Sequence, residues 1–305
     1  MRILLTGGCG YIGSVLVPKL LALGHQVRVV DLQWFGNFLE PHRNLTVDKA
    51  DFRSVTSMPE DDAVIHLAAV ANDPQGELSP SLTWETNALG TMKLAETAAR
   101  WGVKQFLYAS SGSVYGVSTD PEVTENSRLD PISDYNKTKM VAERCVLSYG
   151  EMAVQILRPG TVCGFSPRMR LDVTVNRHTM EALSKRVITV LGGEQMRPHV
   201  HMQDMCDAYL WLLYRPELTG IFNCGFENIS VAEVAHRIAD RIDCRIKSRP
   251  SNDPRSYRLN SKKLLDTGFV PKRSVDEAIE QLAEIYHAGN LRYDDKWINL
   301  KLTPH

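Results

Sequence analysis

The sequence predicts an α/β fold, in which a doubly wound parallel sheet carries a smaller C-terminal lobe. Three observations lead to this prediction. Segments typical of strands and of helices alternate over residues 1–164. A glycine-rich turn separates the first strand from the first helix. The strands are continuous apolar runs, as expected of parallel strands that are buried on both faces.

The first strand, turn and helix form the most informative stretch. Residues 3–5 are apolar, and from residue 11 apolar side chains recur with helical spacing. Glycine allows the backbone to turn sharply and to approach a phosphate, and a helix N-terminus offers free N–H groups to an anion. We expect this turn to bind a phosphate through three glycines, Gly7, Gly10 and Gly13, and through Tyr11 and Ile12, which lie between the last two glycines.

A second apolar strand, residues 26–30, is followed by Asp31. An acid at the end of the second strand is where a carboxylate binds the ribose hydroxyls of NAD. A lone glycine pattern often marks an ordinary turn, but here the strand, the helix and the acid agree. The sequence therefore predicts a Rossmann-type dinucleotide site. Pro18 fits poorly, because proline inside a helix removes a hydrogen bond and favours a kink.

Composition excludes several classes of protein. The chain has 305 residues, 43% of them hydrophobic, and a net charge of −1. This balance provides no basic field, so we expect no nucleic-acid partner. No apolar run is long enough to span a bilayer, and the chain begins directly in a core strand, so we expect neither a membrane span nor a signal peptide. The six cysteines form no CxxC pair, which favours reduced thiols without a metal and a cytoplasmic enzyme.

The pattern of segments changes after residue 164. We therefore expect residues 1–164 to form the dinucleotide-binding domain, and residues 165–305 to form mainly a substrate-binding lobe. Some of the segments at about 187–224 are expected to return to the first domain. The lobe should cover the C-terminal ends of the strands and leave a cleft there for ligands.

Two further motifs suggest alcohol oxidation. Tyr135 and Lys139 lie one helical turn apart, and Ser110 and Ser111 end the strand that precedes them. A neighbouring ammonium and a cationic nicotinamide favour the phenolate of a tyrosine, which then serves as a base. A surface Tyr/Lys pair is the alternative, but the dinucleotide motif earlier in the chain favours catalysis.

These motifs together resemble the extended short-chain dehydrogenase/reductases, in particular the NAD-dependent nucleotide-sugar epimerase/dehydratase family. The resemblance covers nearly the whole chain, and the family's motifs occur in order: Thr-Gly-Gly-x-Gly-x-x-Gly from Thr6, His-Leu-Ala-Ala from His66, Ser-Ser-x-x-Val-Tyr-Gly from Ser110, Tyr-x-x-x-Lys from Tyr135 and Arg-Pro-x-x-Val-x-Gly from Arg158. It implies NAD as cofactor, a nucleotide-diphosphate sugar as substrate, and a homodimer formed through helices near 87–101 and 136–149.

The resemblance also assigns residues. Catalysis falls to Tyr135, Lys139 and Ser111, with Ser110 and Ser113 as weaker candidates. Further cofactor contacts fall to Asp51 and Phe52 around the adenine, to Leu67, Ala68 and Ala69 beneath the pyrophosphate, and to Asn87 near the active site, besides Tyr135 and Lys139. Guanidinium groups bind phosphate in a bidentate manner. The expected substrate contacts are Ser111, Thr161, Arg168, Arg170, Arg197 and Arg255.

Departures from the family pattern narrow the function. The 4,6-dehydratases carry an Asp-Glu pair after the catalytic residue, where this chain has Gly112 and Ser113. Many members of the family carry an asparagine three residues after the arginine that corresponds to Arg158, and this chain has Thr161 at that position. Residues 166–172 are more similar to a capsule and O-antigen subgroup that includes GDP-heptose C4 dehydrogenases. The interpretation is a nucleotide-sugar 4-epimerase of surface polysaccharide biosynthesis. The alternatives are a C4 dehydrogenase, a 4-keto reductase, and a regulator that binds NAD without catalysis.

Overall fold

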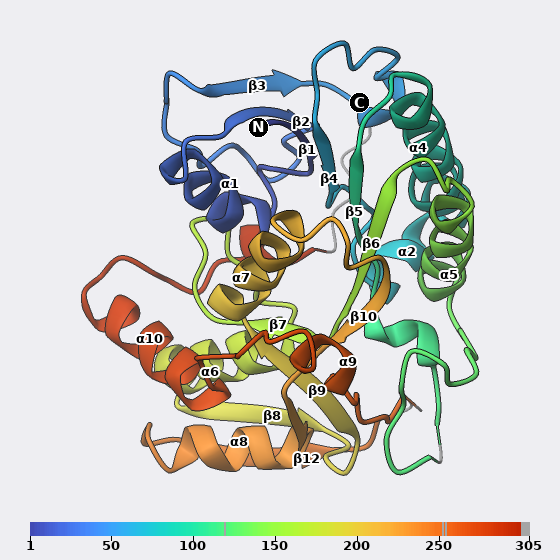
Figure 1. Cartoon of the computed structure of the whole chain (residues 1–305). Helices are drawn as coiled ribbons and strands as arrows, with labels where there is room; N and C mark the ends of the chain where they lie inside the picture. The colour runs from blue at the N-terminus through green and yellow to red at the C-terminus, as the bar shows by residue number, and fades with distance from the viewer. Residues whose placement is uncertain (119, 252, 254, 300–305) are drawn as a thin grey trace.

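A parallel sheet of seven strands forms the centre of the molecule (Figure 1). The computed structural model describes residues 1–118, 120–251, 253 and 255–299. The order of strands across the sheet is β10-β6-β5-β4-β1-β2-β3, and all neighbours are parallel. The strands are β1 (Arg2–Thr6), β2 (Gln26–Asp31), β3 (Leu45–Lys49), β4 (Ala63–His66), β5 (Gln105–Ala109), β6 (Ala153–Pro159) and β10 (Gly220–Cys224). The predicted doubly wound α/β sheet is confirmed.

Helices cover both faces of this sheet (Figure 1). One face carries α1 (Gly13–Ala22) and α7 (Met202–Leu213), and the other carries α4 (Thr91–Arg100) and α5 (Asp134–Leu147). Successive side chains of β1 point to opposite faces of the sheet. Ile3 and Leu5 belong to the core on the α1 side, whereas Leu4 belongs to the core on the α4 side. Both faces of the strand are buried, which explains why its sequence is apolar without interruption.

The first helix continues through Pro18. The proline side chain is exposed to solvent. Proline has no N–H, so the carbonyl group of Ser14 lacks its helical partner. The exposed ring displaces no core side chain, and the helix that follows the glycine motif forms in spite of Pro18.

The helix expected near residues 87–101 begins earlier than expected and is divided into three parts. An α-helix, α3 (Pro80–Trp84), is followed by a π-helical segment, Glu85–Gly90, and then by α4. Within the π-helical segment, the carbonyl of Asn87 accepts a hydrogen bond from the Thr91 hydroxyl at 2.8 Å. Such wide turns often occur at functional sites, and this one directs the amide of Asn87 toward the segment that follows β4.

The lobe is built mainly from residues after 160. A three-stranded sheet has the order β11-β9-β7, and a two-stranded sheet pairs β12 with β8. The remaining helices and strands are α2 (Asp73–Leu78), β7 (Thr161–Cys163), α6 (Thr174–Lys185), β8 (Val187–Leu191), β9 (Met196–His201), β11 (Glu227–Ser230), α8 (Val231–Ala239), β12 (Arg245–Arg249), α9 (Lys262–Leu265) and α10 (Val275–His287), with 3-10 turns at Phe52–Ser54, Gly112–Tyr115 and Asp295–Trp297.

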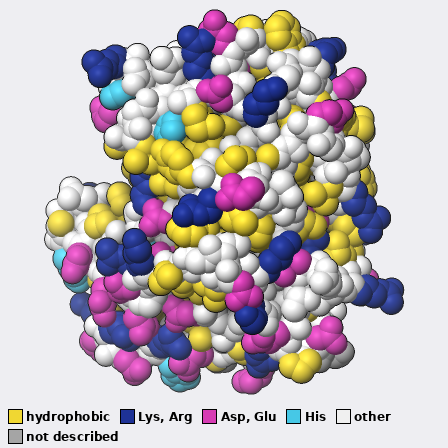
Figure 2. Space-filling model, viewed as in Figure 1, with side chains coloured by type: hydrophobic (Ala, Val, Ile, Leu, Met, Phe, Trp, Pro, Cys, Tyr) yellow, Lys and Arg dark blue, Asp and Glu magenta, His cyan; other side chains and the backbone are white. Residues whose placement is uncertain are grey.

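Segments from the C-terminal half return to the main sheet. Strand β10 pairs with β6 at the edge of the sheet, and α7 packs against α1. Strands β8 and β9 instead belong to the small sheets. On the face shown in Figure 2, acidic and basic side chains are interspersed over the lobe, which lies at the bottom of the view.

Candidate active site

A cavity of about 860 Å³ lies between the carboxyl ends of the central strands and the lobe. Every site residue predicted from the sequence lines this cavity except Asn87. Asn87 is 1% exposed and lies behind the wall, where its amide bonds both backbone groups of Val70. Asn87 therefore holds the segment after β4 in place rather than lining the cavity.

The glycine-rich turn has the close packing expected of a phosphate-binding loop. Gly7 has a φ of +77°, and a side chain on it would place Cβ 2.6 Å from the backbone nitrogen of Ala68. A Cβ on Gly13 would lie 2.5 Å from the carbonyl oxygen of Gly7. Leu67 and Ala68 thus lie directly against the turn, and Ala69 lines the cavity beside them.

Tyr11 connects this turn to the lobe. Its phenol donates to the carbonyl oxygen of Gly164 at 2.7 Å and accepts from the Asn176 amide at 2.9 Å. The side chain is buried, and Ile12 beside it is partly buried. The turn that faces the cavity is therefore anchored to both parts of the molecule.

The carboxylate of Asp31 is held at the mouth of the turn. It accepts hydrogen bonds from the backbone N–H groups of Cys9 at 3.0 Å and of Gln33 at 2.6 Å. Burial raises the pKa of Asp31, while these two bonds and the positive charge of Arg168 oppose that rise. The position, between the turn and the end of β2, suits a carboxylate that receives ribose hydroxyls.

We expect Asp31 to make the protein prefer NAD over NADP by about tenfold or more, because its carboxylate repels a 2′-phosphate. Titration of both dinucleotides by calorimetry measures the ratio. Asp31→Asn should bring the ratio of the NAD affinity to the NADP affinity closer to one. Asp48→Asn, which removes a charge from the neighbouring strand β3, should leave the ratio unchanged. Equal affinity of the wild-type protein for NAD and NADP would contradict the placement of Asp31 at the ribose.

Asp51 and Phe52 form the wall beside Asp31. The Asp51 carboxylate accepts from the backbone and the guanidinium of Arg53, at 2.9 and 2.6 Å. Burial acts to raise the pKa of Asp51, but the bonds with Arg53 outweigh burial and lower it. Asp51 is therefore an ionised carboxylate that is already bonded to Arg53. Phe52 adds an apolar surface next to it on the cavity wall.

Two structural elements bring the catalytic candidates together. Ser111 follows β5 directly, while Tyr135 and Lys139 lie on the cavity-facing side of α5. The Ser111 hydroxyl is hydrogen-bonded to the Ser113 hydroxyl at 2.7 Å, and it lies close enough to the Tyr135 phenol to act against the raised pKa of that phenol. The Lys139 ammonium donates to the carbonyl oxygen of Ala109 at 2.7 Å. Ser111, Tyr135 and Lys139 define the catalytic end of the cavity.

Burial changes the proton affinity of both α5 residues. Burial raises the pKa of Tyr135 to about 12. The negative charge of Asp73 adds to this rise, and the Ser111 hydroxyl opposes it. Burial lowers the pKa of Lys139 to about 7, against the effect of Glu143. The protein groups alone thus favour the neutral phenol, and positive charge beside it is needed to favour the phenolate.

Ser110, the weaker serine candidate, faces a different network. Its hydroxyl donates to Glu143, and both oxygens of that carboxylate also pair with Arg158, at 2.8 and 2.6 Å. Glu143 and Arg158 are each 2% exposed. The charge-assisted pair fixes the end of β6 against α5, and Ser111 remains the serine that reaches Tyr135.

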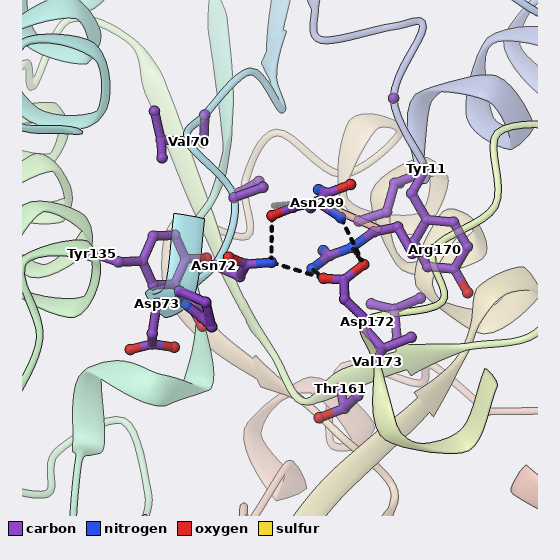
Figure 3. A pocket seen from close by; sticks show the side chains of 18 of the residues that line it. Tyr11, Val70, Asn72, Asp73, Tyr135, Thr161, Arg170, Asp172, Val173 and Asn299 are labelled. Carbon is purple, nitrogen blue, oxygen red and sulfur yellow. Dashed lines mark hydrogen bonds and ion pairs between the residues drawn. The ribbon is translucent and has the colours of Figure 1, made fainter. Parts of the chain in front are cut away.

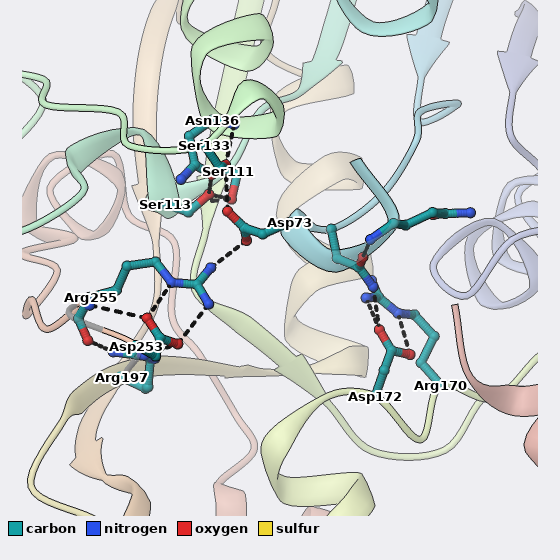
Figure 4. Close-up of polar contacts among 12 residues, drawn as sticks. Asp73, Ser111, Ser113, Ser133, Asn136, Arg170, Asp172, Arg197, Asp253 and Arg255 are labelled. Carbon is teal, nitrogen blue, oxygen red and sulfur yellow. Dashed lines mark hydrogen bonds and ion pairs between the residues drawn. The ribbon is translucent and has the colours of Figure 1, made fainter. Parts of the chain in front are cut away.

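The four predicted arginines form two groups rather than one. Arg197 and Arg255 share the carboxylate of Asp253, at 2.9 and 2.7 Å (Figure 4). Arg168 lies elsewhere: its guanidinium stacks 3.9 Å from the centre of the Phe35 ring. Burial lowers the pKa of Arg168 to about 9, and the neighbouring charge of Arg170 adds to this effect.

Arg170 lies near Arg168 and is paired with Asp172 (Figure 3). The Asn72 amide donates to the same carboxylate at 2.7 Å, so this cluster bridges the first domain and the lobe. Thr161 lines the wall on β7. The guanidinium of Arg168 donates to the side chain of Asn299 from the last described residues.

Among the residues of the cavity wall that sequence reasoning missed are Asp73, Asp253 and Asn299. Asp73 bonds the Ser133 hydroxyl at 2.5 Å and pairs with Arg255. The only local signal was that Asp73 follows a helix-capping asparagine, Asn72, which suggests a helix start rather than a ligand contact.

Three expectations concern other partners. Within the described ranges, no group of three or more His, Cys, Asp or Glu side chains is arranged to hold a metal ion. No helix among the described residues is long and apolar enough to cross a membrane. All six cysteines are free thiols.

Comparisons with known proteins place this geometry in context. Residues 3–225 match the NAD dependent epimerase/dehydratase family. UDP-glucose 4-epimerase from Lactobacillus helveticus is 27% identical, over 97% of this chain and 100% of its own. UDP-glucuronic acid decarboxylase 4 from Arabidopsis thaliana is 30% identical, over 92% of this chain and 67% of its own. The solved structure of MoeE5 in complex with UDP-glucose and NAD has a TM-score of 0.84 at 26% identity, covering 95% of this chain and 99% of that one.

Proposed function

The chain belongs to the NAD-dependent epimerase/dehydratase family, and we propose that it acts at C4 of a nucleotide-diphosphate sugar, as a 4-epimerase of surface polysaccharide biosynthesis. The observation that carries this proposal is the grouping of Ser111, Tyr135 and Lys139 at one end of a cavity whose other end carries the glycine turn and Asp31. Members of the family are NAD-dependent enzymes. Six free cysteines support a reducing compartment, the cytoplasm.

The residues present fit a dinucleotide. The turn at Gly7 and Gly13 leaves no space for side chains, so a phosphate can approach its backbone. Two buried nitrogen atoms of the cavity wall, Trp34 Nε1 and Arg168 Nε, have no hydrogen-bond partner among the described residues. Buried polar groups are normally satisfied, so a polar ligand is expected at this wall. Asp31 would then receive the ribose hydroxyls.

The catalytic end supplies the acid–base chemistry. NAD, when bound, supplies the hydride acceptor and the positive charge of its nicotinamide ring. Ser111 holds the C4 hydroxyl of the sugar, and Tyr135 takes its proton as the carbon is oxidised. Lys139 has its ammonium 6.0 Å from the centre of the Tyr135 ring, where it favours the phenolate. The same groups return a proton to the oxygen when the ketone is reduced on its other face.

Arg197 and Arg255 are the best-placed contacts for the diphosphate of the substrate. Both project into the cavity from the lobe, and their side chains are 13% and 24% exposed. Asp253 holds their guanidinium groups beside one another. Arginine in this arrangement binds phosphate oxygens in pairs. The position of Arg168 beside Asp31 instead favours a role near the cofactor.

The proposal is tested by incubating the purified protein with UDP-glucose and a panel of other nucleotide sugars. We expect a C4 epimer to form without lasting growth of the reduced-nicotinamide absorbance. Absorbance that grows and persists would indicate a C4 dehydrogenase, such as one for GDP-heptose, or in the opposite direction a 4-keto reductase. Binding of NAD without turnover of any sugar would contradict the proposal and favour a non-catalytic regulator.

We also propose that the chain works as a homodimer through α4 and α5. Large apolar side chains are exposed on this side of the molecule: Leu89 is 55% exposed, Met92 40% and Leu147 40%. We expect sedimentation at micromolar concentration to show a dimer. The double substitution Leu89→Lys and Met92→Lys should shift the protein toward the monomer, because it places charge in an apolar interface. A monomeric wild-type protein would contradict this prediction.

A further inference from the structure

Asp73 is a carboxylate at the catalytic end that the proposed mechanism does not use. It lies at the first position of α2, on the cavity wall. The Ser133 hydroxyl donates to one of its oxygens at 2.5 Å, and Arg255 of the lobe pairs with the other. The Asp73 side chain is 15% exposed. Two directed bonds therefore hold it in one orientation while part of the carboxylate still meets the cavity.

Figures 3 and 4 show where this carboxylate points. Asp73 lies beside the Tyr135 side chain and below the serines that follow β5, on the side that faces Arg255. Ser111 and Tyr135 must both reach the oxygen of the reacting carbon. The sugar ring of a substrate therefore lies within this corner, and Asp73 forms part of the surface that the ring contacts.

The charge of Asp73 works against catalysis. After burial, it is the next largest cause of the raised pKa of Tyr135. A negative charge here makes the phenolate harder to form. A serine or an alanine at this position would avoid that cost, so the benefit of the carboxylate is expected in the recognition of the ligand.

The two arginines of the lobe on the Asp73 side of the site are already paired with carboxylates. Arg255 is bonded to Asp73 and, through two nitrogen atoms at 2.8 and 2.7 Å, to Asp253. Arg197 is bonded to the same Asp253 at 2.9 Å. Two carboxylates thus neutralise two guanidinium groups. A diphosphate can compete for these arginines, whereas a single carboxylate on the sugar would meet Asp73 itself.

We propose that Asp73 is a specificity residue that selects sugars presenting hydroxyl or ammonium groups and rejects sugars that carry a carboxylate, such as uronic acids. This inference rests on the proposed function. A hydroxyl or an ammonium donates a hydrogen bond to the carboxylate of Asp73. A uronate placed in the same corner brings two negative charges together in a partly buried site, where they are poorly screened.

The test uses the NAD-loaded protein and two ligands that differ only at C6, UDP-glucose and UDP-glucuronate. If the protein prefers guanosine, GDP-mannose and GDP-mannuronate replace them. Calorimetry measures each affinity, together with that of the nucleoside diphosphate alone. We expect the wild-type protein to bind the neutral sugar about tenfold or more tightly than the uronate. Asp73→Asn should reduce this ratio by about tenfold. It should keep or strengthen binding of the nucleoside diphosphate, because Arg255 loses one of its carboxylate partners.

Glu77→Gln is the matched control, because it removes the same charge from the exposed side of the same helix. It should keep the wild-type ratio. Binding of the nucleoside diphosphate shows that Asp73→Asn still folds. A wild-type ratio near one, or a ratio that Asp73→Asn leaves unaltered, overturns the inference alone. Binding of none of these nucleotide sugars overturns both the inference and the proposed function.

Discussion

Tyr135→Phe is expected to reduce turnover by about a thousandfold or more, because it removes the group that takes the proton from the substrate hydroxyl. The phenylalanine ring fills the same space on α5, so binding of NAD and of the nucleotide sugar should remain close to that of the wild-type protein. Steady-state kinetics measure the turnover, and calorimetry measures both affinities. The effect should therefore appear in kcat with little change in KM.

Tyr209→Phe provides a matched control. Tyr209 is fully buried, its hydroxyl has no hydrogen-bond partner in the described part of the chain, and it is not among the residues that line the cavity. The control removes the same hydroxyl from the other side of the sheet, on α7, and should leave turnover unchanged. Activity of Tyr135→Phe within tenfold of the wild-type value would exclude Tyr135 as the proton acceptor.

The main sheet could be predicted because its strands are buried on both faces and are therefore continuously apolar in sequence. Strand β5 is buried at every residue, and its sequence is apolar or aromatic after the first position. Strand β9 could not be predicted in the same way. It carries Arg197, His199 and His201, and both histidines are buried. Polar residues that are buried only through tertiary packing give no periodic signal in the sequence.

The same distinction applies to the site. Gly7, Ser111, Tyr135 and Lys139 could be identified because each belongs to a short motif within one strand–turn–helix unit. Asp73 could not, because its partners lie 60 and 182 residues away along the chain. Pairings over such distances depend on how the lobe folds over the sheet.

The arginines show that residue type alone does not predict where a side chain lies in the site. Four guanidinium groups were expected around one diphosphate, since arginine is suited to phosphate. In the structure, Arg197 and Arg255 lie together, whereas Arg168 lies over Phe35 on the side of Asp31. Residues 166–172 carry no regular element that would have indicated their path. Their position follows from contacts with the turn at Tyr11 and with Asn299.

The protein is expected to leave C5 and C6 of the sugar untouched. Elimination of water across these atoms needs an acid and a base near the catalytic serine. Gly112 and Ser113 stand at the positions where the resemblance places the acidic pair of the dehydratases, and neither ionises near neutral pH. The Ser113 hydroxyl is also occupied, because it donates to the Asn136 amide oxygen at 2.6 Å.

The backbone around Gly112 strengthens this expectation. A Cβ at Gly112 would lie 3.0 Å from the carbonyl oxygen of Pro159 and 3.2 Å from the Leu259 side chain. An aspartate there requires these neighbours to move. The absence of an acid at this position is therefore matched by the packing around it, and Gly112→Asp alone should not create a dehydratase.

Turnover in heavy water, followed by NMR of the recovered sugar, tests the prediction. We expect no deuterium at C5 and no 6-deoxy-4-keto product, while a sugar labelled at C4 should exchange its label with the cofactor. A known dTDP-glucose 4,6-dehydratase under the same conditions provides the positive signal. Deuterium at C5 would contradict the prediction, and Asp73 is then the carboxylate to examine, because it lies beside Tyr135 on the cavity wall. Loss of that deuterium in Asp73→Asn would identify Asp73 as the base that removes the C5 proton.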